Sequence, residues 1–171
     1  DVAVAVTGRL TLTTAVKHSS KSAAGGAGTD QGKRTDAGAV LTYRWDEETS
    51  AYVVAQSTVA NTGGRRDNDR IGVGGAMPLT EKIGASGEVS TGTTGFGARA
   101  GIDYHPTAYD HSYLGYRLDP DRASSGEISS ALAGDDLGVI AVGSRHRFTE
   151  EVSAFAEDSY DIYGDRRSLT Q

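Results

Sequence analysis

The stretch from Phe96 to Leu118 decides the fold of this chain, and it reads FGARAGIDY-HPTAYDH-SYLGYRL. Successive side chains of a β-strand point to opposite faces, so Ala98, Ala100 and Ile102 share one face while Arg99 and Asp103 share the other. A polar turn follows, and the alternation then resumes. The stretch therefore predicts a β-hairpin with one apolar and one charged face.

Composition limits the proteins to which such a hairpin can belong. The 171 residues suit one domain, 1–171, and 37% hydrophobic residues is low beside the usual value of about 45–50%. The chain has no cysteine, which excludes disulfides and thiolate metal sites. A net charge of −6 argues against a nucleic-acid partner. No apolar run approaches the roughly 18 residues of a membrane helix, and the first residues do not read as a signal peptide.

The same alternation recurs along the chain and predicts an all-β protein, an up-and-down antiparallel meander of about ten strands. Ser19 to Asp36, Ala60 to Arg70 and Asp119 to Asp136 lack periodicity and are predicted to be loops. Two turns, Leu79–Ala85 and Phe148–Ala154, match in residue class at every position, which indicates a degenerate hairpin repeat. The predicted strands are Val2–Val6, Leu10–His18, Ala37–Trp45, Ala51–Val59, Ile71–Leu79, Ile83–Ser90, Phe96–Tyr104, Ser112–Leu118, Leu137–Phe148 and Val152 to about Tyr163.

Strand length and connection pattern both favour part or all of a transmembrane β-barrel. Membrane-spanning strands need about 9–11 residues, and outer-membrane barrels have short turns at one end and long loops at the other. Aromatic side chains should then gather near the tight turns as a girdle at the membrane boundary, although aromatic residues also favour strands in general. The predicted girdle contains Tyr43, Trp45, Tyr52, Tyr104, Tyr109 and Phe148, with Phe96, Tyr160 and Tyr163 toward the other rim.

At two segments, Gly97–Tyr104 and Arg147–Glu157, the chain resembles Gram-negative outer-membrane β-barrels, and more narrowly the barrel portions of large proteobacterial surface proteins. The resemblance implies a bacterial outer-membrane location and a lipid bilayer as partner. Complete barrels of this class keep both termini in the periplasm and usually end on an aromatic strand. We therefore expect a slice of a longer protein, with at least one strand before Asp1 and one after Gln171, unless ten strands close alone. Other parts of that polypeptide, or an envelope assembly, would be further partners.

A closed sheet in lipid must turn its charged side chains inward, because a charge facing lipid costs several kcal/mol. In Ala51–Val59 and Leu137–Ser144 both faces are apolar, so the sequence does not decide which side chains point inward and which point outward. The residues predicted to face the lumen are Arg44, Glu88, Arg99, Asp103, Arg117 and Glu157.

Motifs for chemistry are weak, so the sequence predicts neither an enzyme nor a cofactor. Ala27–Lys33 begins like a phosphate-binding loop but continues with Arg34 where Ser or Thr is required, and Gly72–Gly75 lacks the third glycine of a dinucleotide site. The acidic clusters Asp67–Arg70 and Asp119–Arg122 could hold Ca²⁺ but lack EF-hand spacing and suit solvated loops better. The four histidines are scattered along the sequence: His18, His105, His111 and His146. Metal coordination by them is not expected.

Three functions fit these observations. The first is an outer-membrane β-barrel that acts as a passive pore or as an anchor for surface loops or attached domains. The second is a soluble β-sandwich or β-solenoid used as an adhesive or binding module. The third, an outer-membrane hydrolase, has no residue pattern to support it.

Overall fold

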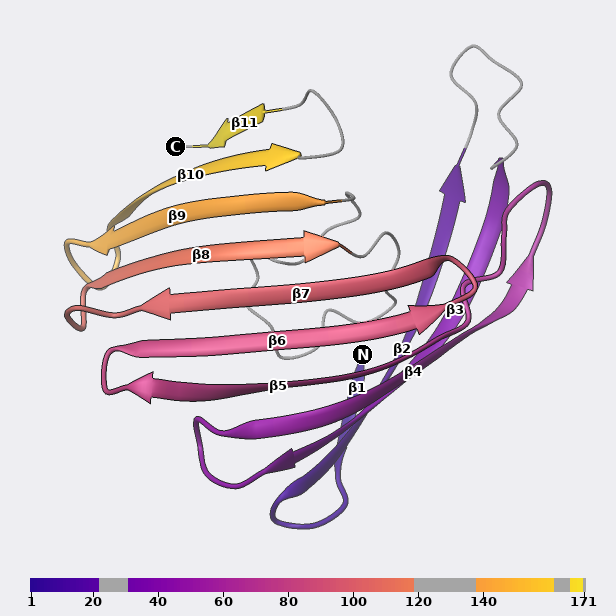
Figure 1. Ribbon diagram of the computed structural model, residues 1–171, viewed down its shortest axis with the longest axis horizontal. Coiled ribbons are helices and arrows are strands. Elements are labelled where there is room, and N and C mark those ends of the chain that lie inside the picture. Colours follow the sequence, from indigo (N-terminus) through magenta and orange to yellow (C-terminus); the bar gives the residue numbers. More distant parts are fainter. Residues whose placement is uncertain (22–30, 119–137, 162–166, 171) are drawn as a thin grey trace.

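The computed structural model describes residues 1–21, 31–118, 138–161 and 167–170, which form a single antiparallel β-sheet (Figure 1). No helix occurs among these residues. The strands are β1 (Val2–Ala5), β2 (Leu10–Lys21), β3 (Gly32–Arg44), β4 (Ser50–Asn61), β5 (Arg70–Thr80), β6 (Ile83–Gly92), β7 (Gly95–Tyr104), β8 (Asp110–Leu118), β9 (Val139–Arg147), β10 (Ser153–Asp161) and β11 (Arg167–Thr170).

Strand order in the sheet follows the chain from β1 to β11, so every strand pairs with its sequence neighbours. This confirms the prediction of an all-β, up-and-down antiparallel meander. The ten predicted strands correspond to β1–β10, whereas β11 was not predicted. The strands from β2 to β10 contain 9 to 13 residues each.

Tight turns join the strands at one end of the sheet, and a hydroxyl or carboxylate stabilises each of them. Thr80 Oγ1 accepts hydrogen bonds from the amides of Lys82 and Ile83 at 3.2 and 3.1 Å, and Thr149 Oγ1 repeats this bond with Val152 at 3.0 Å. The repeated turn sequence therefore encodes a repeated turn geometry, since such side chains satisfy turn amides locally. Thr7, Asp46 and Thr107 play the same part in the other three turns.

The predicted loop Ser19–Asp36 is wrong at both ends. Strand β2 continues to Lys21 and β3 begins at Gly32, and the two pair in register from Leu10↔Tyr43 to Lys21↔Gly32. These strand ends lack apolar alternation because their side chains meet polar partners, which periodicity cannot detect. The predicted loop Asp119–Asp136 lies outside the described residues.

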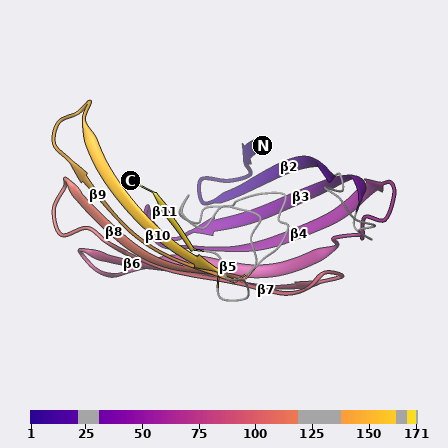
Figure 2. The same ribbon diagram turned by 90° about the horizontal axis from the view of Figure 1, so that it is seen from above.

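The sheet is strongly curved: in Figure 2, β2–β4 and β8–β10 rise on the same side of β5–β7. Among the described residues β1 and β11 do not pair with each other, so this sheet is open. The described strands form a single layer, in which Val40, Tyr52 and Val54 make a buried apolar cluster. This part of the chain therefore has two faces and no core between two layers.

Candidate functional site

Strand register assigns each side chain to one of two faces. Cross-strand partners share a face, so the chain of partners Glu88↔Arg99↔Arg117 defines the polar face, and Val89↔Ala98↔Leu118 defines the apolar face. The polar face carries Arg34, Asp36, Arg44, Tyr52, Gln56, Arg70, Glu88, Ser90, Arg99, Asp103, Tyr113, Arg117 and Glu157. The apolar face carries Val16, Leu41, Tyr43, Val53, Ile71, Val73, Met77, Val89, Phe96, Ile102, Tyr104, Leu114, Ile140, Val142 and Tyr160.

Burial is inverted relative to a water-soluble protein. Glu88 and Arg99 are each 4% exposed, whereas Val89, which lies between Glu88 and Ser90 in β6, is 49% exposed. Ile102 and Leu114 on the apolar face are likewise 48% and 51% exposed. Side chains on the concave side of a curved sheet crowd together, so we infer that the polar face is the concave one. Across the middle of β6, β7 and β8, apolar side chains are therefore exposed and charged side chains are buried.

All six residues predicted to face a lumen lie on the polar face. Glu88, Arg99 and Arg117 follow one another across β6, β7 and β8, and all three are buried. Asp103 pairs through Tyr113 and Gly143 with Glu157 in a second row. Arg44 pairs with Ser50 and is partly exposed. The phase that the sequence left undecided is also resolved, because Val54 and Ala141 are buried while Val53 and Val142 are exposed.

Two tyrosine–glutamate bridges cross this face, and the sequence did not predict them. The Tyr52 hydroxyl in β4 donates to Glu88 Oε2 in β6 at 2.7 Å, across Gly74 in the strand between them. A Cβ at Gly74 would collide with the Tyr52 ring, so only glycine leaves room for this bridge.

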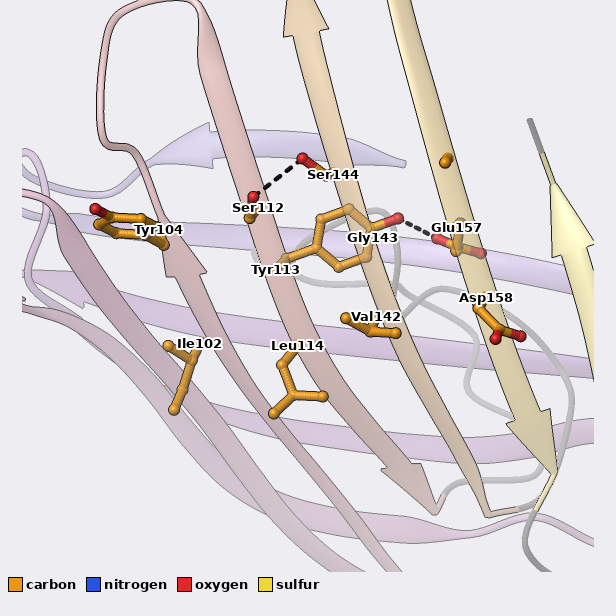
Figure 3. Close-up of a pocket in the computed structure, with 11 residues that line it drawn as sticks. Ile102, Tyr104, Ser112, Tyr113, Leu114, Val142, Gly143, Ser144, Glu157 and Asp158 are labelled. Atoms are coloured by element: carbon orange, nitrogen blue, oxygen red, sulfur yellow. Dashed lines mark hydrogen bonds between the residues drawn. The ribbon is translucent and has the colours of Figure 1, made fainter.

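The second bridge has the same design. The Tyr113 hydroxyl in β8 donates to Glu157 in β10, and Figure 3 shows the ring lying over β9 at Gly143. A Cβ at Gly143 would meet that ring as well. The four strands β3–β6 and the four strands β7–β10 therefore place tyrosine, glycine and glutamate at equivalent positions. The repeated turn phrase was the sequence signal for this larger repeat.

Most of the predicted aromatic girdle lies near the tight turns on the apolar face. Trp45 follows β3 and Phe148 follows β9, with 53% and 62% of each side chain exposed. Tyr43 packs edge-to-face on Trp45 with ring centroids 5.1 Å apart, and Tyr104 ends β7. Tyr109 lies in the turn before β8, where the Arg147 guanidinium is 5.6 Å from its ring centroid.

Tyr52 does not lie with these aromatic residues, which corrects that part of the prediction. It is 4% exposed and points to Glu88 on the polar face. Proximity to a turn suggested the girdle, but strand phase decides the face, and both faces of β4 look apolar in sequence. Phe96 and Tyr160 are 60% and 50% exposed on the apolar face, and Tyr163 lies outside the described residues.

The connection between β4 and β5, residues 62–69, is fixed by side-chain hydrogen bonds. Asn68 is fully buried, and its Oδ1 accepts a hydrogen bond from Thr94 at 3.0 Å. Asp69 accepts hydrogen bonds from the Ser57 hydroxyl at 2.7 Å and the Thr58 amide at 3.0 Å. These two donors lower the pKa of the Asp69 carboxyl below its ordinary value. The oxygens considered for Ca²⁺ are therefore used to hold the connection in place.

The histidines considered as metal ligands lie in separate small groups. His105 stacks on His111 with ring centroids 4.3 Å apart, and His111 Nε2 lies 2.9 Å from Asp103 Oδ1. His146 lies 2.6 Å from Asp110, and His18 hydrogen-bonds Thr35. In the part of the chain that the structure describes, no three such residues form a metal site. The acidic cluster Asp119–Arg122 lies outside that part.

Of the two glycine motifs, Ala27–Lys33 lies mostly outside the described residues; Gln31, Gly32 and Lys33 are described, the last two in β3. Gly72 lies in β5, and a Cβ added there would come 2.6 Å from the Ser90 Cβ. Close packing of β5 against β6 therefore accounts for this glycine.

A shallow hollow of about 520 Å³ lies along β7–β10 and is the pocket drawn in Figure 3. Ile102, Leu114 and Val142 line it, and the hydroxyls of Ser112 and Ser144 lie 3.1 Å apart at its edge. Asp158 also lines it and shares a face with Val142, so it places a charge on the apolar face. Lys33 and Asp110 share this face near strand ends, so the face is apolar along the middle of β2–β9 and is interrupted by a charge in β10.

No helix long and apolar enough to cross a membrane occurs among the described residues. Comparison of the chain with protein-family models, with curated proteins and with solved structures finds no match.

Proposed function

We propose that this chain forms the wall, or part of the wall, of a transmembrane β-barrel that acts as a passive pore. The apolar face would contact lipid, and the polar face would line the interior. A bacterial outer membrane is the location that the resemblance of the sequence implies. The observation that carries the proposal is the inverted burial, with charges such as Arg99 covered and neighbours such as Ile102 exposed.

Energetics support this orientation. Leaving an aliphatic side chain half exposed to water forfeits about 1 kcal/mol of the 1.5–3 kcal/mol that full burial provides. Summed over the apolar face, this loss reaches roughly 15 kcal/mol, as large as the whole stability of an ordinary domain. Lipid removes the penalty. The reverse orientation would put Arg99 and Arg117 in lipid at about 2–4 kcal/mol each near the bilayer midplane.

A membrane anchor is the second candidate, and one observation favours it. Arg99 and Arg117 are only 4% and 5% exposed, so this part of the polar face is closed to water. A filled interior suits an anchor better than a wide channel. The soluble sandwich would need a second sheet against the apolar face, and the described residues form one layer.

Two measurements test the proposal. The purified protein should partition into detergent or vesicles and show heat-modifiable electrophoretic mobility, and a stable monomer in plain buffer would refute a membrane barrel. Conductance across a planar bilayer then separates the pore from the anchor. Steady single-channel steps are expected of a pore, and an inserted, folded but silent protein would be an anchor.

A further inference from the structure

We propose that residues 62–69, the connection between β4 and β5, form a fixed constriction inside the pore and set the size of solute that can pass. This inference rests on the proposed pore. It assigns a structural role to Arg65 and Asn68, two buried polar residues that lie outside the strands.

The connection lies over the polar face. Arg34 Nη1 in β3 donates to the carbonyl oxygen of Arg66 at 3.3 Å, and Gln56 Nε2 in β4 donates to the carbonyl oxygen of Asn68 at 3.2 Å. Both donors are polar-face side chains. Because their partners are backbone atoms of the connection, the chain itself must pass over that face. In Figure 1 the ribbon between β4 and β5 curls back toward β3.

The attachments reach across several strands. Arg65 Nη2 donates to Ser19 Oγ in β2 at 3.2 Å, and the Thr94 hydroxyl, in the turn between β6 and β7, donates to Asn68 Oδ1 at 3.0 Å. Strands lie about 4.8 Å apart, so β2 and β6 are separated by roughly 19 Å along the wall. The connection therefore spans a broad sector of the interior.

The connection is also held rigidly. Arg65 is 4% exposed and Asn68 is fully buried. The Asn68 amide donates to Thr58 Oγ1 at 2.8 Å, and the Thr58 hydroxyl donates to the buried Asp36 at 2.7 Å. Arg34, buried beside it, pairs with Asp36 at 2.9 Å. A segment with buried side chains and internal hydrogen bonds opens rarely, unlike an exposed loop tip.

In a barrel of the expected size, a connection that packs on the inner wall would block much of the lumen. A cylinder of about a dozen strands, tilted by roughly 40°, is about 24 Å wide between backbones. A layer of chain packed on a sheet adds about 10 Å. Residues 62–69 would therefore close a large share of the bore on their side.

The test removes the two side-chain attachments that reach furthest, from Arg65 to β2 and from Asn68 to the turn between β6 and β7, and measures the bore. The double variant Arg65→Ala, Asn68→Ala should raise single-channel conductance at least about twofold, because the layer is then held mainly beside β3 and β4 and can move out of the lumen. It should also admit larger neutral polymers. Arg66→Ala is the matched control, since Arg66 is exposed and contributes its backbone carbonyl, which the substitution keeps. Unchanged conductance in a folded double variant would overturn the constriction. A silent wild-type protein would instead refute the pore.

A second measurement covers the case in which the double variant fails to fold. The chain has no cysteine, so single thiols can be introduced and labelled specifically. In vesicles, Asn68→Cys should react with a water-soluble thiol reagent about tenfold or more slowly than Arg66→Cys, since rare local opening limits access. Equal rates would overturn the fixed constriction.

Discussion

Replacing Leu114 by arginine distinguishes a lipid-facing sheet from a water-facing one. Leu114 lies at the centre of β8 (Asp110–Leu118) on the apolar face, and it is 51% exposed. On a water-soluble surface, a substitution at a half-exposed side chain with no special role changes the free energy of unfolding by about 0.5 kcal/mol or less. At a bilayer midplane, arginine costs about 2–4 kcal/mol. The same substitution therefore has two well-separated expected outcomes.

The expected loss corresponds to a shift of roughly 30- to 700-fold in the unfolding equilibrium. It can be measured by urea titration of the protein in vesicles, with Trp45, the single tryptophan, as the fluorescent probe. Tyr104→Arg is the matched control, because Tyr104 shares the face but ends β7 near the tight turns. Near the interface the cost of arginine falls to about 0–1 kcal/mol.

The test depends on how the cost of arginine changes with depth in the bilayer. A large effect at Leu114 and a small one at Tyr104 is the pattern that a membrane-spanning strand requires. If Leu114→Arg leaves the free energy of unfolding within about 0.5 kcal/mol of wild type in vesicles, the apolar face does not meet lipid and the barrel proposal is wrong.

Three further predictions address separate features. Tyr113→Phe should destabilise the protein by about 1.5–3 kcal/mol in the same titration, because it leaves Glu157 without the hydroxyl donor; a neutral effect would remove the bridge from the stabilising interactions. The lowered pKa of Asp69 means that its ionised form stabilises the connection above the unfolded-state pKa of about 4, and this contribution is lost as pH falls below that value. The protection of the Thr58 amide, which is its exchange rate compared with that of an unstructured amide at the same pH, should therefore fall on acidification, and Asp69→Asn, which keeps an oxygen acceptor, should weaken that pH dependence. Trp45 should be quenched more by lipids brominated near the headgroup than at the chain ends, and the opposite order would contradict the girdle.

The strands were predictable because the face pattern is local. In β7, Ala98, Arg99 and Ile102 alternate so regularly that pleat geometry alone predicts which side chains share a face. The turns were predictable for a similar reason, since Thr80 and Thr149 bond to amides only two and three residues away.

Prediction failed where both faces of a strand have similar polarity. Tyr52 and Val53 read alike in sequence, and only the pairing of β4 with β3 and β5 shows that Tyr52 is buried and Val53 exposed. The same limit concealed the ends of β2 and β3, where Arg34 and Asp36 look like loop residues but pair with each other inside the curve of the sheet.

Alternation along the chain determined by itself that this protein is a meander of strands with one apolar and one charged face, because pleating depends on neighbouring residues only. Only the tertiary structure shows which side chains form contacts across the polar face. The bridges from Tyr52 and Tyr113 join strands two apart, and the attachments of Arg65 and Asn68 join segments tens of residues apart. Such contacts depend on the register and curvature of the whole sheet, which no local pattern specifies.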